Sequence, residues 1–330
     1  MKLVENEFIK FMEKFDENSF RIILEDGEHL IGDGEPAFTV KINKIPKMMD
    51  MLTSTSITLG EAYMNGDIEI EGDLYTALNM FLGQMGKFST DTKKLKNIIF
   101  TSKSKANQKK EVSSHYDIGN DFYKMWLDET MSYSCGYFKN ENDTLYQAQC
   151  NKVDRILEKL NLSDGMTLCD IGCGWGFLLI EAAKKYNIKG VGITLSREQK
   201  AKFEQRIKEE NLSDRLEVKL LDYRDLPKQH MEFDRVVSVG MIEHVGRGNY
   251  EEFMQCVKSV LKQGGVFVLH FISALKEYPG DAWVKKYIFP GGVIPSLREI
   301  MQIAGELGIS QVQVSRMEKK ILKVLRERID

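Results

Sequence analysis

The first part of the chain mixes helical and strand-like patterns. Apolar side chains recur at helical spacing near the N-terminus, and shorter runs alternate between apolar and polar positions as half-buried strands do. Gly- and Asp-rich turns separate these runs, which predicts a small α+β domain. The predicted helices are residues 2–17, 47–53 and 74–85, and the predicted strands are residues 20–24, 37–42 and 67–71.

The second part of the chain, from about residue 166, alternates strands and helices regularly. Short β-branched or apolar runs are separated by amphipathic segments. This alternation predicts an α/β, Rossmann-like domain: a parallel sheet with right-handed crossovers and helices on both faces. The predicted strands are residues 166–171, 190–194, 216–221, 235–239 and 266–272, and the predicted helices are residues 177–186, 197–211 and 249–262.

Charge is distributed unevenly, although the 330 residues carry a net charge of only −3. Residues 1–84 contain 7 basic and 16 acidic side chains, residues 85–112 contain 8 lysines and 2 acids, and residues 113–330 contain 31 of each kind. This predicts an acidic domain, a basic linker and a neutral larger domain. The linker is either a solvated connection or, with Ile98–Phe100 at its centre, a surface for anionic lipid headgroups. Nucleic acid is disfavoured, because no nucleic-acid-binding fold is recognisable.

Composition narrows the setting in which the protein works. No apolar stretch approaches the roughly 20 residues of a membrane span. Acidic residues lie among the apolar ones of residues 1–17, so this segment does not resemble a signal peptide. The five cysteines lack paired metal-site spacing, and their odd number suits a reducing compartment. We therefore expect a soluble cytoplasmic protein without a metal site.

A glycine-rich loop, DIGCGWG at residues 170–176, follows the first predicted strand of the second part. Its glycines, Gly172, Gly174 and Gly176, allow a tight turn and the close approach of a ligand. The GxGxG spacing differs from the GxGxxG of dinucleotide sites and is preceded by an acid. In its strand–loop–helix setting the loop predicts a seat for S-adenosylmethionine. Asp170 is expected to orient the loop or to bind the ammonium group of the methionine.

Two further loops complete the cofactor site predicted from the residues. Thr194, Leu195 and Gln199 follow the second strand, where ribose oxygens are expected, although nearby Ser196 is also a good helix N-cap. The next strand ends in a carboxylate and a ring suited to the adenine amine and face; the alternative is a turn held by an ion pair. These last residues are Asp222, Tyr223 and Arg224.

Together these motifs resemble the cyclopropane fatty acid synthase family, which includes the mycolic acid cyclopropane synthases. The resemblance runs from about residue 113 to residue 316, and residues 60–74 are similar to the family's sterol-carrier-like, lipid-binding N-terminal domain. The matching motifs are HYDIGNDF (115–122), YSCGYF (133–138), DIGCGWG (170–176), TLSREQ (194–199), SVGMIEHVG (238–246), LHFI (269–272) and KYIFPGG (286–292).

The resemblance implies transfer of a methylene group from S-adenosylmethionine to the cis double bond of an unsaturated phospholipid acyl chain. A carbocation would lose its proton to bound bicarbonate, and aromatic rings would stabilise the cation and exclude water. It also implies a homodimer that contacts the inner face of the membrane transiently. The implied residues are Cys135, Glu243, His270 and the Ile272 backbone for bicarbonate, Tyr116, Tyr133 and Ser134 for the cofactor, and Tyr137, Phe138, Tyr287 and Phe289 for the acyl chain.

Each implied catalytic residue also has a structural explanation. Cys135 would be a buried small apolar side chain, His270 a hydrogen-bonded core histidine, and Glu243 part of a polar helix entrance.

The motifs end near Arg316, so the C-terminus is expected to be shortened or altered and the edge of the fifth strand exposed. Residues 317–330 would form a basic amphipathic helix, or residues 321–325 a strand paired with 310–314. Two other functions stay open: a family member that binds cofactor or lipid with impaired catalysis, and a methyltransferase of a small soluble substrate.

Overall fold

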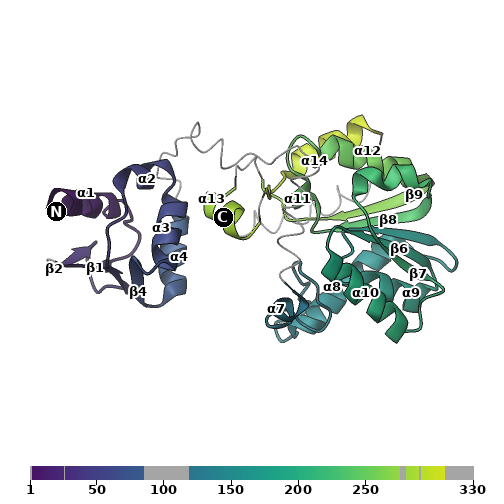
Figure 1. The fold of residues 1–330 in the computed structure, drawn as a ribbon, viewed down its shortest axis with the longest axis horizontal. Coiled ribbons are helices and arrows are strands. Elements are labelled where there is room, and N and C mark those ends of the chain that lie inside the picture. Colours follow the sequence, from purple (N-terminus) through teal and green to yellow (C-terminus); the bar gives the residue numbers. More distant parts are fainter. Residues whose placement is uncertain (1, 26, 85–118, 276–279, 290, 309–330) are drawn as a thin grey trace. The chain divides into compact units, whose positions relative to one another are not determined.

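The computed structural model describes residues 2–25, 27–84, 119–275, 280–289 and 291–308. These residues belong to two compact units (Figure 1). The N-terminal unit comprises the described residues up to Gln84 together with residues 281–288. The larger unit comprises the described residues of 119–280 and 289–308.

The N-terminal unit is built on a four-stranded mixed sheet with the order β2-β1-β3-β4. Strand β1 is antiparallel to β2 and parallel to β3, and β3 is antiparallel to β4. Alternate residues of β1 and β3 are buried, as the alternating pattern predicted. The elements are α1 (Lys2–Met12), β1 (Phe20–Leu24), β2 (Gly27–Ile31), β3 (Phe38–Ile42), α2 (Met48–Thr53), α3 (Thr55–Met64), β4 (Ile68–Gly72) and α4 (Leu74–Gly83).

The predicted α+β character of this unit is confirmed, but two elements were not anticipated. Strand β2 is mostly exposed and polar, so it lacks the alternation on which the prediction relied. Helix α3 contains β-branched residues and a glycine, which are weak helix formers. Helix α1 also ends five residues before the predicted end at residue 17.

A helix from late in the sequence, α13 (Ala282–Tyr287), belongs to the N-terminal unit. The Tyr287 hydroxyl donates a hydrogen bond of 2.8 Å to Glu61 Oε1 on α3, and Lys286 forms an ion pair with the same carboxylate. These two partners lower the pKa of Glu61. The Trp283 ring occupies the space in which a side chain at Gly60 would lie. Residues 281–288 are therefore grouped with the N-terminal unit, whereas the sequence placed them in the domain of residues 113–330.

The larger unit contains a parallel sheet with the order β7-β6-β5-β8-β9. The prediction of a parallel sheet is thereby confirmed. The largest difference from the predicted strands is in β9, which begins five residues before residue 266 and has an irregular register with β8. The strands are β5 (Thr167–Ile171), β6 (Lys189–Thr194), β7 (Leu216–Leu220), β8 (Phe233–Val239) and β9 (Leu261–His270).

Helices cover both faces of this sheet (Figure 1). One core contains apolar residues of α8, α9 and α10, and the other contains residues of α12 and α14. The sequence did not predict α8, which begins with a capping box made by Thr144 and Gln147. The helices are α7 (Asn120–Lys124), α8 (Leu145–Leu160), α9 (Phe177–Tyr186), α10 (Arg197–Glu209), the 3₁₀ helix η2 (Tyr223–Gln229), α11 (Ile242–Val245), α12 (Tyr250–Val260) and α14 (Leu297–Glu306).

Some expectations fall on residues outside the described ranges. They concern the basic linker at 85–112, Tyr116, and the alternatives for residues 310–314 and 317–330. Within the described ranges, β9 pairs with β8 only. Among the described residues, no helix is both long enough and apolar enough to cross a membrane.

Phe203 on α10 gives a test of this packing. Its ring is fully buried and occupies the space beside Gly176 and Gly192, which bring the glycine loop and β6 close to α10. We expect Phe203→Ala to lower the free energy of unfolding by about 3–5 kcal/mol, because a large cavity would form. The control Leu220→Ala, at a position 38% exposed, should change it by less than about 1 kcal/mol. Urea unfolding followed by tryptophan fluorescence measures both, and equal losses would contradict the packing role.

Candidate active site

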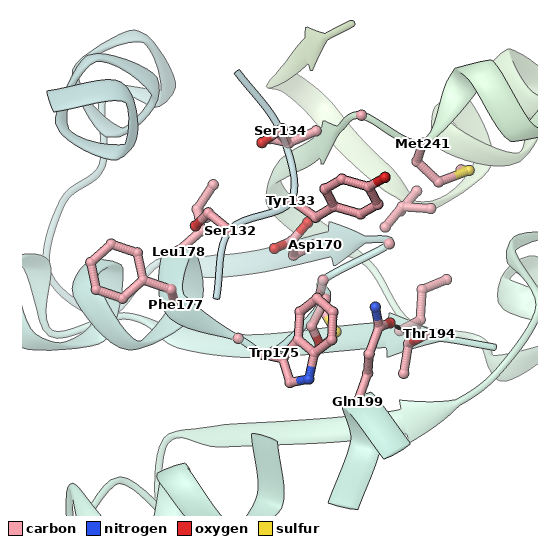
Figure 2. Close-up of a pocket in the computed structure, with 18 of the residues that line it drawn as sticks. Ser132, Tyr133, Ser134, Asp170, Trp175, Phe177, Leu178, Thr194, Gln199 and Met241 are labelled. Carbon is pink, nitrogen blue, oxygen red and sulfur yellow. Dashed lines mark hydrogen bonds between the residues drawn. The ribbon is translucent and has the colours of Figure 1, made fainter. Parts of the chain in front are cut away.

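A cavity lies at the carboxyl ends of β5, β6 and β8 and is also lined by the loop after β7 (Figure 2). The strand order reverses at β5: the chain continues to β6 and β7 on one side and to β8 and β9 on the other. Ligands of open α/β sheets bind at such a reversal, outside the carboxyl ends of the strands. A segment before α8, residues 130–134, forms a further part of the wall.

The glycine loop after β5 brings its backbone to this cavity. Gly172, Gly174 and Gly176 have φ values of 85°, 54° and 85°, which favour glycine. A Cβ atom at Gly172 would lie 2.8 Å from the Met241 side chain, and one at Gly176 would clash with the Phe203 ring. A Cβ at Gly174 would meet no atom within 4 Å, so this glycine faces open space. The loop therefore combines tight packing behind it with room for a ligand in front.

Asp170, the penultimate residue of β5, is a buried acid in the cavity wall. Burial raises the pKa of its carboxyl group to about 7. Its Oδ1 atom has no hydrogen-bond partner among the residues described. A buried carboxylate without partners is unfavourable, so this group is suited to bind a ligand cation such as an ammonium group.

The turn from β6 to α10 brings Thr194, at the end of the strand, beside Gln199 in the first turn of the helix (Figure 2). Thr194 Oγ1 donates a hydrogen bond of 2.7 Å to Gln199 Oε1. Ser196 has the capping role considered from the sequence, because its Oγ accepts a hydrogen bond of 3.1 Å from the backbone N–H of Gln199. The cap and the Thr194 hydroxyl together hold the Gln199 amide at the cavity.

The loop after β7 contains the ion pair that was the alternative explanation of its sequence. Arg224 Nε and Nη2 donate to the two Asp222 oxygens over 2.8 and 2.6 Å. Asp222, Tyr223 and Arg224 nevertheless all line the cavity, and the buried Tyr223 hydroxyl has no hydrogen-bond partner within the described residues. The ion pair therefore holds the turn in place while its residues face the ligand space.

The remaining predicted cofactor residues follow the same pattern. Tyr133, Ser134 and Leu195 line the cavity, whereas Tyr116 lies outside the described residues. Thus every predicted cofactor residue in the described part of the chain is at this cavity.

Aromatic side chains surround Tyr133 on the cavity wall. Its ring centroid lies 4.8 Å from that of Trp126, 5.8 Å from that of Tyr123 and 6.0 Å from that of Phe289. The sequence singled out Tyr133 and Phe289 but not Tyr123 or Trp126. The sequence feature that could have indicated Tyr123 and Trp126 is their position directly after the HYDIGNDF motif.

The glycine loop is also tied to α7. Trp175 Nε1 donates a hydrogen bond of 2.6 Å to Asn120 Oδ1, and the Trp175 ring centroid lies 5.1 Å from that of Tyr123. Trp175 itself lines the cavity and is buried. Two motifs of the sequence, HYDIGNDF and DIGCGWG, therefore meet through one hydrogen bond.

Glu243 and His270 lie after β8 and at the end of β9, as the predicted strands implied. The Ile272 backbone N–H donates a hydrogen bond of 2.7 Å to Glu243 Oε1. Among the described residues, the buried atoms Glu243 Oε2 and His270 Nδ1 have no hydrogen-bond partner. Burial raises the pKa of Glu243 and lowers that of His270, and the charge of Lys152 lowers the latter further. Both shifts have the same main cause, because burial disfavours the charged form of each group.

These observations decide two of the structural alternatives. Cys135 is exposed, so its interpretation as a buried apolar side chain is wrong. His270 has a ring nitrogen without a partner in the described part of the chain, so it is not a fully hydrogen-bonded core histidine. Glu243 does lie in the first turn of α11, but its carboxylate also binds the Ile272 backbone.

The predicted acyl-chain residues are in different surroundings. Phe289 contacts the rings of Tyr133 and His244. Tyr137 and Phe138 are exposed and do not line the cavity, and the Arg155 guanidinium lies over the Tyr137 ring at 4.7 Å. Tyr287 belongs to the N-terminal unit, where it binds Glu61. The acyl-chain roles of Tyr137, Phe138 and Tyr287 stay predictions.

The sheet order, the glycine loop and the cavity define a methyltransferase that uses S-adenosylmethionine. The chain belongs to a family of such enzymes, because the family model described as mycolic acid cyclopropane synthetase matches residues 103–329. This range extends beyond Arg316, where the motifs ended. Residues 8–93 match a family described only as a domain of unknown function (DUF7884), so the lipid-binding role of the N-terminal unit stays a prediction.

Similar proteins carry related names. A probable fatty acid methyltransferase of Pseudomonas putida is 37% identical over 323 residues, covering 92% of this chain and 78% of that protein. The cyclopropane-fatty-acyl-phospholipid synthase of Escherichia coli K12 is 38% identical, covering 87% and 75%. The structure of the cyclopropane synthase MmaA2 from Mycobacterium tuberculosis is similar with a TM-score of 0.57 and 34% identity, over 61% of this chain and 74% of that one.

A second similar structure bears on the cofactor. Mycolic acid cyclopropane synthase CmaA1, solved with S-adenosylhomocysteine (SAH) and CTAB, has a TM-score of 0.56 and 34% identity, over 60% of this chain and 73% of that one.

The titration of Asp170 should control cofactor binding. With a pKa near 7, the carboxyl is mostly protonated at pH 6 and mostly ionised at pH 8 in the ligand-free protein. The ligand ammonium needs the ionised form, so we expect SAH to bind about tenfold more tightly at pH 8 than at pH 6. Calorimetric titration of the isosteric variant Asp170→Asn should show weaker binding without this pH dependence. The same pH profile in both proteins would contradict the assignment.

Proposed function

We propose that this enzyme transfers a methylene group from S-adenosylmethionine to the cis double bond of an unsaturated phospholipid acyl chain and so forms a cyclopropane ring. The observation that carries the proposal is the pair of unpartnered buried atoms, Glu243 Oε2 and His270 Nδ1. Together with the Ile272 backbone they suit a small anion that accepts a proton. The names of the similar proteins from Pseudomonas putida and Escherichia coli support the lipid substrate.

An alkene is an uncharged and poor nucleophile, which determines what the site must do. Its π electrons form the new carbon–carbon bond to the sulfonium methyl group while the sulfur–carbon bond breaks, and a carbocation remains on the acyl chain. Loss of a proton from the transferred methyl group then closes the ring. The site must therefore stabilise a cation and exclude water, because water would capture it.

The aromatic residues of the wall meet the first requirement. Tyr133 lines the cavity and contacts the rings of Trp126 and Phe289. Ring faces attract a nearby cation, more strongly where water is excluded. Burial raises the pKa of Tyr133, so its phenol stays neutral. A neutral phenol does not present a phenolate oxygen that would react with the carbocation.

Bicarbonate fits the residues after β8 and β9. When bound, it supplies the base that removes the proton. Glu243 offers the hydroxyl group of bicarbonate an acceptor, the oxygen that is unpartnered in the described structure, and His270 offers one ring nitrogen. The Ile272 N–H keeps Glu243 oriented by binding its other oxygen. Cys135 adds a thiol donor, as the family resemblance implied.

The proposal extends to a membrane-contacting surface on the N-terminal unit. Leu74, Leu78 and Leu82 recur every four residues along α4 and are exposed, and Tyr75 beside them is 74% exposed. The basic segment 85–112 follows in the sequence. Exposed apolar side chains that are followed in the sequence by lysines suit an anionic lipid surface. We place the enzyme at the inner face of the membrane, peripherally and transiently bound, and the family resemblance adds a homodimer.

Incubation with labelled S-adenosylmethionine and vesicles of unsaturated phospholipid, with and without bicarbonate, tests the reaction. We expect label in cyclopropane acyl chains, and Glu243→Gln or Cys135→Ser should reduce turnover about a hundredfold or more because proton removal is impaired. Affinity for SAH should stay within about threefold, since neither side chain lines the cofactor cavity. Glu251→Gln, an exposed glutamate on α12, is the matched control and should have full activity.

The outcomes separate the functions considered. Unchanged turnover in either variant would remove the bicarbonate site, whereas cofactor binding by the parent protein without product would indicate impaired catalysis. Transfer of label to a soluble amine or alcohol, and not to lipid, would indicate a different methyltransferase.

Vesicle binding should depend on salt and on α4 separately. Raising the salt from about 0.1 M to about 1 M shortens the Debye length from about 10 Å to about 3 Å, so binding of anionic vesicles should fall several-fold. The double variant Leu78→Ser/Leu82→Ser should weaken binding at both salt concentrations, because it removes apolar contact. Vesicle co-sedimentation measures both effects, and salt-independent binding would show that the lysines of 85–112 serve only as a linker.

A further inference from the structure

A buried lysine on α8 has no role in the reaction as described so far. Lys152 is 5% exposed, and its Nζ donates hydrogen bonds of 2.7 Å to Ser134 Oγ and 2.5 Å to Gln149 Oε1. Both acceptors are uncharged. Within the described part of the chain, no carboxylate lies within ion-pair distance of this ammonium group. A buried charge is unfavourable unless a counter-charge compensates it, so the position requires an explanation.

Lys152 and Gln149 together hold one wall of the cofactor cavity. They lie about one turn apart on α8, and Gln149 Nε2 donates to the backbone oxygens of Ser132 and Ser134 over 3.3 and 2.9 Å. The segment held in this way carries Tyr133, which lines the same cavity as Asp170 (Figure 2). Cys135 is the next residue of the segment. Gln149 and Lys152 of α8 thus hold the backbone of residues 132–134 and the Ser134 hydroxyl.

The charge of Lys152 also acts on the predicted anion site. It lowers the pKa of His270, after burial and together with Lys159. Burial lowers the pKa of Lys152 to about 8, against the opposing influence of Asp128 and Cys135. Lys152 therefore carries its positive charge at neutral pH, where it lines the cofactor cavity and acts electrostatically on His270.

We propose that Lys152 is a positioning residue of this active site. Its ammonium group holds the segment 132–135 through Ser134 and Gln149, and it provides the positive charge that retains a small anion near Cys135 and His270. An anion bound there supplies the counter-charge that Lys152 lacks. The inference rests on the proposed function in taking this anion to be bicarbonate.

The test follows the accessibility of Cys135 and does not depend on turnover. The rate at which iodoacetamide alkylates Cys135 is measured by mass spectrometry with and without bicarbonate, at constant pH and ionic strength. In the parent protein bicarbonate should slow this rate. In Lys152→Met, half-protection should need about tenfold more bicarbonate, because a charged hydrogen-bonding partner of the site is lost. Lys152→Arg should recover part of the effect, and Lys185→Met, which removes a half-exposed lysine paired with Asp154 of α8, should leave it unchanged.

A second variant and a pH series distinguish positioning from a general loss of structure. Gln149→Met removes the backbone contacts but keeps the charge, so Cys135 should react faster without bicarbonate while protection stays within about threefold of the parent. In the parent protein, protection should weaken as the pH rises above about 8, where Lys152 loses its proton. Urea unfolding followed by tryptophan fluorescence verifies that each variant is folded, because SAH binding itself depends on the wall that Lys152 and Gln149 hold.

Three results would overturn the inference: no protection of the parent by bicarbonate, equal protection in Lys152→Met, or parent-like cyclopropane formation by Lys152→Met. The proposed function fails independently of it if bicarbonate protects Cys135 in the parent protein but no cyclopropane product forms.

Discussion

The reversal of strand order at β5 is the constraint on which the rest of the larger unit depends. Because the chain leaves β5 in one direction and returns at β8 on the other side, the loops after β5 and β8 separate and leave a cavity between them. The glycine loop can border that cavity only because Phe203 packs into the space behind Gly176. The glycine loop therefore packs against the Phe203 ring on one side and borders the cavity on the other.

The cavity and its surroundings contain polar groups that the described protein residues do not satisfy. Asp170, Glu243 and His270 each have a buried atom without a partner in the described part of the chain, and Lys152 has a buried charge with neutral partners. Such groups destabilise a ligand-free protein. Ligands of matching charge would recover this free energy on binding, and in our proposal these are the ammonium group of the cofactor and a small anion.

The sequence predicted the repeated elements of the sheet well, because each parallel strand is buried on both faces and reads as an apolar run. It predicted the cofactor loops for a related reason: residues directly after parallel strands must meet at one edge. It missed α8, although Ala148, Val153 and Leu157 form an apolar stripe there. The polar side chains Gln149 and Lys152 interrupt that stripe, and their burial depends on acceptors in a distant loop.

The amino-acid sequence by itself therefore determined the class of fold, the place of the glycine loop and the loops after β6 and β7 that border the cofactor cavity, since these follow from local patterns of burial and backbone freedom. Tyr133 and Ser134 were placed there only by the family resemblance. Only the tertiary structure decided which polar atoms are left without partners, that α13 packs on α3 through Glu61, and that Lys152 is buried beside Ser134. Hydrogen-bond satisfaction and pKa shifts depend on neighbours far apart in the chain, and no local pattern contains them.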